Sequence, residues 1–165
     1  MHESEKMTSR ELGLVLAQQL LDVQDLHFGL WDPALPVSMA NFGLAQQRYT
    51  DLLLEHLQEL LADRTAAQIL DIGCGTGHML EQLVASGYAA DAVNPSHYLN
   101  RQVKARFSRL AGASPALFES TFEEMPHARC QGHYDVLLCS ESFQYIPLPA
   151  FFEKASGLMR NGGYV

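Results

Sequence analysis

The stretch from Gln68 to Leu80, QILDIGCGTGHML, decides the fold. It opens with a short apolar run that contains a single acid, a pattern typical of a buried strand in a parallel sheet. Glycines at alternate positions then end the run, and Met79, Leu80 and Leu83 begin a helical pattern. A strand, a glycine turn and a helix in this order direct backbone N–H groups and a helix N-terminus toward a ligand.

The glycines of this turn predict a ligand that contains a nucleoside. Gly73, Gly75 and Gly77 lack a Cβ atom, so the backbone can turn sharply and a flat ligand can approach it closely. Their spacing is G-x-G-x-G, whereas dinucleotide sites usually have G-x-G-x-x-G. Asp71 precedes the first glycine, where its carboxylate would repel a pyrophosphate but attract a cationic amino-acid group. The sequence therefore favours another adenosine compound over a dinucleotide.

The pattern D-x-G-x-G-x-G, formed by Asp71, Gly73, Gly75 and Gly77, resembles motif I of the class I S-adenosylmethionine-dependent methyltransferases. The resemblance implies an α/β fold: a doubly wound parallel (Rossmann-like) sheet with an N-terminal helical lid. It implies S-adenosylmethionine as the cofactor and S-adenosylhomocysteine as the product. It also implies that these four residues and Cys74 contact the cofactor.

A second match follows the strand predicted over residues 89–93. This strand ends at Asn94 and Pro95, where the family usually has an acid that binds both ribose hydroxyls, so the resemblance places both residues at the cofactor. The amide oxygen of Asn94 accepts a neutral hydrogen bond, which is weaker than the charge-assisted bonds of a carboxylate. On this basis Asn94→Asp is expected to keep or tighten cofactor binding.

A third strand is predicted at residues 116–118. In the family, an acid and an apolar residue beyond this strand bind the amino group and ring face of the adenine. Placing the motif by its Glu-Met-Pro end puts Thr121 on the acid position and Phe122 beside it. Phe122 is then expected to offer a stacking surface to the adenine.

Residues 134–139 predict a fourth strand, and reacting groups of open α/β sheets gather at the carboxyl ends of such strands. Ser140 follows this strand and is expected at the cofactor, with Glu141 and Tyr145 beside the reacting methyl group. Together with His27 from the N-terminal region, these two are the candidate catalytic residues. A general base matters only where the acceptor must lose a proton.

The N-terminal part predicts two amphipathic helices, over about residues 12–23 and 45–61, joined by a structured segment rich in aromatic residues. Residues 27–33 of that segment, followed by residues 45–51, resemble the lid of small-molecule methyltransferases, which closes over the cofactor and lines the acceptor pocket. The expected organisation is a lid over residues 1–66 and a cofactor-binding core over residues 67–165.

Composition limits the possible binding partners and the cellular location of the protein. The 165 residues are 47% hydrophobic and 18% charged with a net charge of −8 and no basic run, which argues against a nucleic-acid partner. No apolar stretch approaches the roughly 20 residues that span a bilayer. Cys74, Cys130 and Cys139 form an odd set without disulfide spacing, which favours a reducing cytoplasm.

His127, Cys130 and His133 could be interpreted as metal ligands. They crowd into one short loop with no fourth ligand paired nearby, which falls short of a typical zinc pattern. No metal is therefore expected.

The sheet is expected in the order 3-2-1-4, followed by the start of a fifth strand. Residues 160–165 resemble the family's turn into that strand, and the chain stops there. The expectation is that the chain is a C-terminally truncated fragment of a protein of roughly 220–290 residues. A fourth strand near an open edge would then promote edge-to-edge self-association.

The predicted function is transfer of a methyl group from S-adenosylmethionine to a small, largely apolar acceptor through a nitrogen, oxygen or carbon atom. The sulfonium is already a strong electrophile, so the protein mainly aligns the acceptor and excludes water. Two alternatives stay open: a module that binds S-adenosylmethionine without activity, and a nucleotide-dependent oxidoreductase.

Overall fold

The computed structural model describes residues 9–21, 23–25, 27–64, 66–110, 115–126 and 130–165. They form two compact units, Met1–Leu52 and Leu53–Val165. The boundary falls inside helix α2 (Phe42–Leu60), whereas the sequence places the functional boundary after residue 66.

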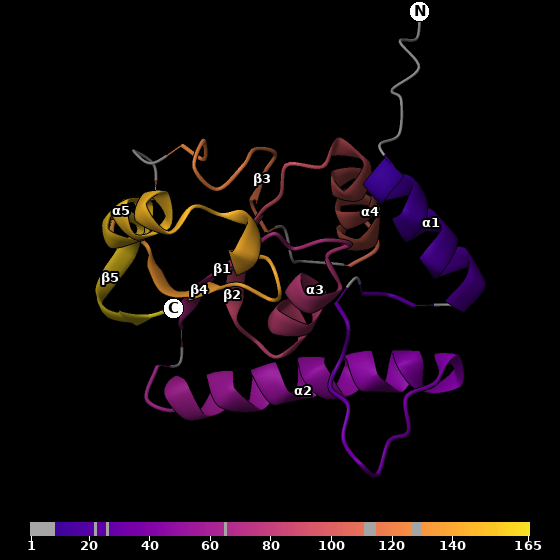
Figure 1. The fold of residues 1–165 in the computed structure, drawn as a ribbon. Coiled ribbons are helices and arrows are strands. Elements are labelled where there is room, and N and C mark those ends of the chain that lie inside the picture. Colours follow the sequence, from indigo (N-terminus) through magenta and orange to yellow (C-terminus); the bar gives the residue numbers. More distant parts are fainter. Residues whose placement is uncertain (1–8, 22, 26, 65, 111–114, 127–129) are drawn as a thin grey trace, which may run out of the picture. The chain divides into compact units, whose positions relative to one another are not determined.

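The second unit contains a five-stranded sheet in the order β3-β2-β1-β4-β5, in which every neighbouring pair is parallel. The predicted order and fold class are confirmed (Figure 1). The strands are β1 (Gln68–Ile72), β2 (Ala89–Val93), β3 (Leu117–Phe118), β4 (Tyr134–Leu138) and β5 (Met159–Tyr164). Because β1 lies between β2 and β4, the turn that follows it reaches the carboxyl edge at the centre of the sheet.

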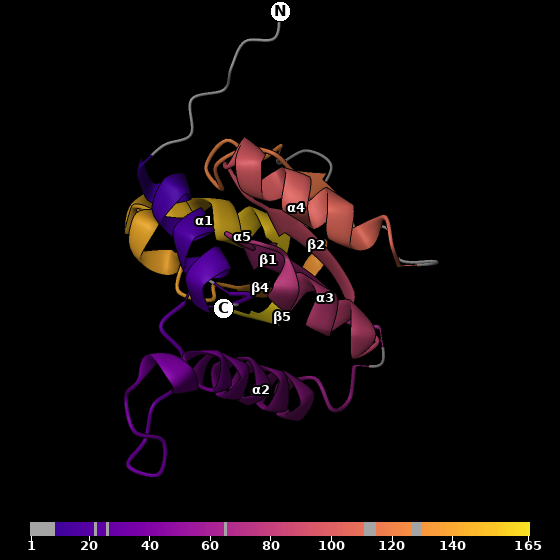
Figure 2. The same cartoon turned by 90° about the vertical axis from the view of Figure 1, so that its right-hand side faces the viewer.

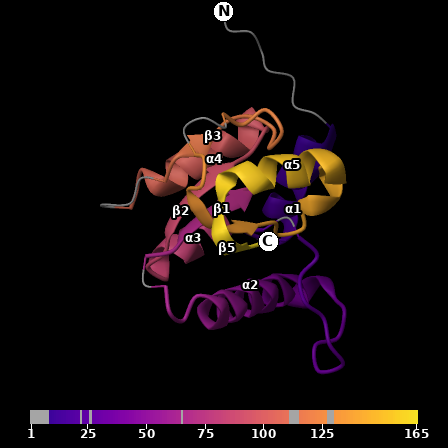
Figure 3. The same cartoon turned by 90° about the vertical axis from the view of Figure 1, so that its left-hand side faces the viewer.

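Helices cover both faces of the sheet, as a doubly wound fold requires. On one face α3 (His78–Ala85) and α4 (His97–Phe107) pack against the sheet, as Figure 2 shows from that side. On the other face α5 (Leu148–Leu158) packs against it, as Figure 3 shows. Alternation along β1 supplies both cores, since Ile69 belongs to the first cluster and Leu70 and Ile72 to the second.

Local signals in the sequence set several helix ends. The Ser96 hydroxyl accepts a hydrogen bond from the Leu99 N–H (3.2 Å) and caps α4 as predicted. Gly87 has a φ of +89° just beyond α3, the left-handed conformation that ends helices. Leu110 lies past the end of α4 and Phe152 lies on the outer side of α5, and both side chains are exposed.

Strand β5 begins earlier than predicted. The expected turn at residues 160–163 is part of the strand, and the pairing with β4 shifts between Tyr134–Met159 and Val136–Tyr164. Gly162, with a φ of +75°, absorbs this irregularity. Among the described strands β3 and β5 form the sheet edges, and edge-to-edge self-association stays a prediction.

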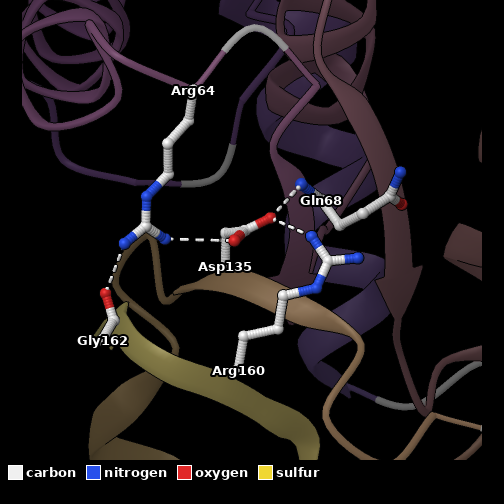
Figure 4. A network of polar contacts seen from close by, with 5 residues as sticks. All are labelled: Arg64, Gln68, Asp135, Arg160 and Gly162. Atoms are coloured by element: carbon white, nitrogen blue, oxygen red, sulfur yellow. Dashed lines mark hydrogen bonds and ion pairs between the residues drawn. The ribbon is translucent and has the colours of Figure 1, made fainter.

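Asp135 holds three elements together at the amino end of the sheet (Figure 4). Its carboxylate accepts hydrogen bonds from the Arg64 guanidinium (3.0 Å), the Gln68 N–H (2.9 Å) and the Arg160 guanidinium (2.7 Å). Arg64 also donates to the Gly162 carbonyl (2.7 Å). The cluster ties β1, β4 and β5 together at the edge opposite the glycine turn.

The first unit contains α1 (Ser9–Leu21), the short helix η1 (Met39–Asn41) and the start of α2. The segment before η1 is fixed to α2 through backbone contacts. The Leu30 N–H donates to the Ala45 carbonyl (2.8 Å), and Gly29 adopts a φ of +79° directly against the same backbone. None of the helices in the described ranges is long and apolar enough to cross a membrane.

Gly29→Ala is expected to loosen this packing. A Cβ atom at this position would lie 2.5 Å from the Ala45 carbonyl carbon and 2.7 Å from the Gln46 nitrogen, and backbone cannot move aside as a side chain can. Crowding and the left-handed conformation together are expected to cost about 2–4 kcal/mol. Hydrogen exchange at the Leu30 amide measures the loss. Gly43→Ala in α2, where a Cβ meets no described atom within 4 Å, is the control and should be neutral or stabilising.

Candidate functional site

The glycine turn after β1 has the backbone conformation that its composition predicts. Gly73, Gly75 and Gly77 have φ values of +76°, +56° and +81°, all in the region that favours glycine. The Gly73 N–H donates to the Val93 carbonyl of β2 (2.8 Å), and the Gly77 N–H closes the turn on the Cys74 carbonyl (2.8 Å). Gly77 then caps α3, so the turn presents a helix N-terminus at the carboxyl edge of the sheet.

Asp71 and Cys74 lie below the surface of this turn. Asp71 is fully buried in β1, and Cys74 is buried beside it. Burial, reinforced by the nearby Asp71 carboxylate, raises the pKa of the Cys74 thiol well above its usual value. Burial also raises the pKa of Cys139, beyond β4, to about 11. Both thiols therefore stay protonated at neutral pH, which argues against a thiolate nucleophile at this site.

Asn94 is tied to the glycine turn. Its side-chain amide donates to the Gly75 carbonyl (3.3 Å), and the residue is buried. Its backbone carbonyl accepts a hydrogen bond from the Asn100 side chain (3.0 Å), while Pro95 beside it is exposed. Asn100 is fully buried on the apolar face of α4, a placement visible in the sequence as a polar residue on a hydrophobic stripe. Asn100 was not among the site residues predicted from the sequence.

The bond from Asn94 to Gly75 reverses the expectation for Asn94→Asp. A carboxylate cannot donate to the Gly75 carbonyl, and its oxygen would face another oxygen. The variant is now expected to bind S-adenosylhomocysteine about tenfold more weakly, by loss of one hydrogen bond and repulsion. Isothermal calorimetry on Asn94→Asp and Asn94→Ala measures this. Tighter binding by the aspartate variant would mean that its carboxylate accepts hydrogen bonds from the ribose hydroxyls and does not contact the turn.

The two residues placed beyond β3 differ in their surroundings. Thr121 is partly exposed, and its hydroxyl accepts a hydrogen bond from the Glu124 N–H (3.3 Å). Phe122 is buried, with its ring 5.2 Å from that of Phe151 in the core under α5. In this structure Phe122 therefore serves the core, and stacking on an adenine would require it to leave that cluster.

Glu119 is the acid closest to the end of β3, and sequence analysis passed over it. Its carboxylate pairs with the Lys104 ammonium and accepts a hydrogen bond from the Asn100 side chain (3.3 Å). The Lys104 hydrogen bond is the main reason that the pKa of Glu119 lies below its usual value. The exposed Lys104 side chain thus connects α4 to the end of β3.

The segment beyond β4 meets the glycine turn. The Ser142 hydroxyl donates to the carbonyl of Ile72, the last residue of β1, and its side chain lies directly against Gly73. Ser140 and Glu141 precede it and are partly exposed. Glu141 has a φ of +57°, the only non-glycine positive φ among the described residues. Tyr145, in the short helix η2 (Phe143–Tyr145), is 61% exposed.

His27 belongs to the first unit. The Gln46 side chain donates to the His27 carbonyl (2.7 Å) and the Asp25 carbonyl (3.0 Å), which fixes this segment on α2. The imidazole Nε2 lies 3.6 Å from the Asp25 carboxylate, and the ring centroid lies 4.6 Å from that of Tyr49. The Nδ1 atom is buried without a hydrogen-bond partner among the described residues. Gln46 lies in the stretch 45–51 that resembles part of the family's lid, but it was not among the predicted site residues.

Of the three residues considered as metal ligands, the structure describes Cys130 and His133. His127 lies outside the described residues. Cys130 is buried near the Tyr134 hydroxyl (3.9 Å), and the His133 ring packs edge-on against the Tyr134 ring at 4.9 Å. In the part of the chain that the structure describes, no group of three His, Cys, Asp or Glu side chains could hold a metal ion.

Proteins of known structure share this fold. An S-adenosylmethionine-dependent methyltransferase from Clostridium acetobutylicum superimposes with a TM-score of 0.61 at 18% identity, over 94% of this chain and 55% of that one. Geranyl diphosphate C-methyltransferase from Streptomyces coelicolor, in complex with S-adenosyl-L-homocysteine, superimposes with a TM-score of 0.69 at 18% identity, over 91% and 58%.

Curated relatives match at the level of sequence. The ubiquinone biosynthesis O-methyltransferase of Nitrosomonas europaea is 25% identical over 69% of this chain and 48% of its own length. That of Paraburkholderia xenovorans is 31% identical over 63% of this chain and 44% of its own length. The chain thus spans about half the length of the curated relatives it matches.

A family profile described as "Methyltransferase domain" matches residues 44–165, which is most of the chain and includes the glycine turn and the ends of β2, β3 and β4. The chain therefore belongs to the methyltransferase domain family.

Proposed function

We propose that the chain binds S-adenosylmethionine and belongs to an enzyme that transfers its methyl group to a small, largely apolar acceptor. The observation that carries the proposal is the turn of three left-handed glycines at the carboxyl end of β1. A Cβ atom at Gly73 would lie 2.6 Å from the Ser142 side chain, so this turn has a close-packed form that only glycine can take. Because these residues lack a Cβ atom, a flat nucleoside could approach the backbone of the turn closely, which supports the proposal.

The proposed cofactor ligands surround this turn. The residues are Asp71, Gly73, Cys74, Gly75, Gly77, Asn94, Pro95, Thr121 and Ser140. While the amide nitrogen of Asn94 holds Gly75, its oxygen can accept one ribose hydroxyl. Thr121 can accept from the adenine amino group. The buried Asp71 carboxylate supplies negative charge beneath the turn, which complements a cationic amino-acid group.

When bound, S-adenosylmethionine supplies an electrophilic methyl group, so the residues have to orient the acceptor and exclude water. Glu141 and Tyr145 follow β4 and are proposed to contact the acceptor. Where the acceptor atom carries a proton, the Glu141 carboxylate or the imidazole of His27 can remove it. For His27 the proposal is supported by its buried Nδ1 atom, which has no partner within the described part of the chain.

The class of acceptor is proposed from the relatives. Their names specify ubiquinone biosynthesis and geranyl diphosphate, which points to a small acceptor with a substantial apolar part. Oxygen and carbon acceptors are both represented in those names. An aromatic hydroxyl compound and an isoprenoid diphosphate are therefore the first two acceptors to assay.

Calorimetry with S-adenosylmethionine, S-adenosylhomocysteine, NAD and NADP tests the cofactor. Binding of the first two without affinity for the nucleotides is the expected result, and preference for NAD or NADP would replace the proposal with an oxidoreductase. Transfer of a labelled methyl group to the two acceptors then tests activity. Binding without transfer to any acceptor would favour a module that binds the cofactor but is inactive.

A further inference from the structure

The carboxyl ends of β1 and β4 are joined by a side chain. Their backbone pairing runs from Ile69–Val136 to Asp71–Leu138. The next residue of β1, Ile72, accepts a hydrogen bond at its carbonyl from the Ser142 hydroxyl. Ser142 thus extends the connection between the two strands beyond the point at which β4 leaves the sheet.

The Ser142 side chain also packs directly against Gly73, the first glycine of the turn. A Cβ atom at Gly73 would lie 2.6 Å from the Cβ of Ser142, a distance that folded proteins essentially never show, and 3.2 Å from its Oγ, which is a tight contact. On its other side Gly73 donates its N–H to the Val93 carbonyl of β2 (2.8 Å). Gly73 is therefore held between β2 and Ser142, and the position of the whole turn depends on both contacts.

The residue before Ser142 has a backbone conformation that its neighbours must impose. Glu141 has a φ of +57°, in the left-handed region that a residue with a Cβ rarely occupies. Such conformations persist only where surrounding contacts fix them, and they gather at functional sites. Ser142 is covalently attached to Glu141 and is fixed to β1, so it supplies such a contact.

We propose that Ser142 is a positioning residue that fixes the glycine turn and Glu141 relative to each other. The inference rests on the proposed function, because the turn is the proposed cofactor site and Glu141 is the proposed acceptor contact. Without the Ser142 hydrogen bond, the segment of residues 140–142 loses an attachment to β1. The glycine turn and Glu141 are then no longer held in a fixed position relative to each other, and both cofactor affinity and turnover fall.

Ser142→Ala tests this by removing the hydroxyl while keeping the Cβ against Gly73. Calorimetry well below the melting temperature is expected to show about five- to tenfold weaker binding of S-adenosylhomocysteine, as loss of one hydrogen bond implies. Ser156→Ala is the control, because the Ser156 hydroxyl is exposed and bonds only locally to the Glu153 carbonyl (2.7 Å). A lower melting temperature with unchanged affinity would show a structural role alone and would overturn the proposal.

A paired replacement tests the contact from the other side. Gly73→Ala introduces a Cβ against Ser142 and is expected to weaken binding more than about tenfold. Ser142→Gly removes the opposing Cβ together with the hydroxyl, so the affinity loss of Gly73→Ala/Ser142→Gly should be clearly smaller than the losses of the two single variants combined. Additive losses would overturn the proposal. A wild-type chain that binds no S-adenosyl compound overturns the proposed function as well, whereas wild-type binding with an unaffected Ser142→Ala overturns this inference alone.

Discussion

Gly75→Val is expected to abolish the rise in melting temperature that S-adenosylhomocysteine produces, while the unliganded chain still folds. Gly75 has a φ of +56°, a conformation in which a β-branched side chain is strongly disfavoured. The turn must then adopt another backbone conformation, which breaks the hydrogen bond from the Asn94 side-chain amide to the carbonyl of residue 75. A ligand at 100 times its dissociation constant stabilises a protein by about 2.7 kcal/mol, and this entire increment should be lost.

Gly87→Val is the matched control for this experiment. Gly87 has a φ of +89°, so valine meets the same backbone penalty, but it lies past the end of α3, and a Cβ there meets no described atom within 4 Å. This variant should melt at a lower temperature and still respond fully to the ligand. An undiminished response in Gly75→Val would show that the ligand does not bind at this turn.

The sheet could be predicted because its signals are local. The run at residues 68–72 and the run at residues 89–93 are strands with the bounds read from the sequence. Gly87 and Ser96 end and begin helices through contacts with residues no more than a few positions away. Signals of this kind depend on backbone geometry and not on what the rest of the chain does. The strand order, in contrast, was expected from the resemblance to the class I methyltransferases and not from these local signals.

The roles of individual site residues could not be predicted in the same way. An aromatic residue beyond a strand can cover a ligand or fill the core, and only tertiary packing puts Phe122 against Phe151. The partner of Asn94 is a carbonyl in another loop, and one amide can serve either that carbonyl or a ligand. Ser142 gave no signal, because its importance lies in its closeness to Gly73 across the sheet.

Asp135→Ala is expected to lower the stability of the fold strongly while leaving the cofactor site intact. The carboxylate of this buried residue accepts from two guanidinium groups and one backbone N–H, all from other strands or loops (Figure 4). Removing it leaves the Gln68 N–H without its acceptor and two arginines without their counter-ion. Because both arginines are partly exposed and water can solvate them, about 2–4 kcal/mol is expected, below the cost of a fully buried pair.

Urea denaturation of the unliganded chain measures this loss, with Asp51→Ala as the control. Asp51 is exposed in α2, where it accepts only from the Gln47 side chain (2.8 Å) among the bonds described, so its replacement should cost less than about 0.5 kcal/mol. Affinity for S-adenosylhomocysteine below the melting temperature should be unchanged in both variants, because Asp135 lies at the amino end of β4 and the glycine turn follows the carboxyl end of β1.

Hydrogen exchange should also show where the anchoring is lost. Since Arg160 and Gly162 belong to β5, Asp135→Ala should raise the exchange rate of amides in β5 before it does so in β1. Weaker ligand binding with normal stability would mean that this network acts on the site and not on the attachment of β5.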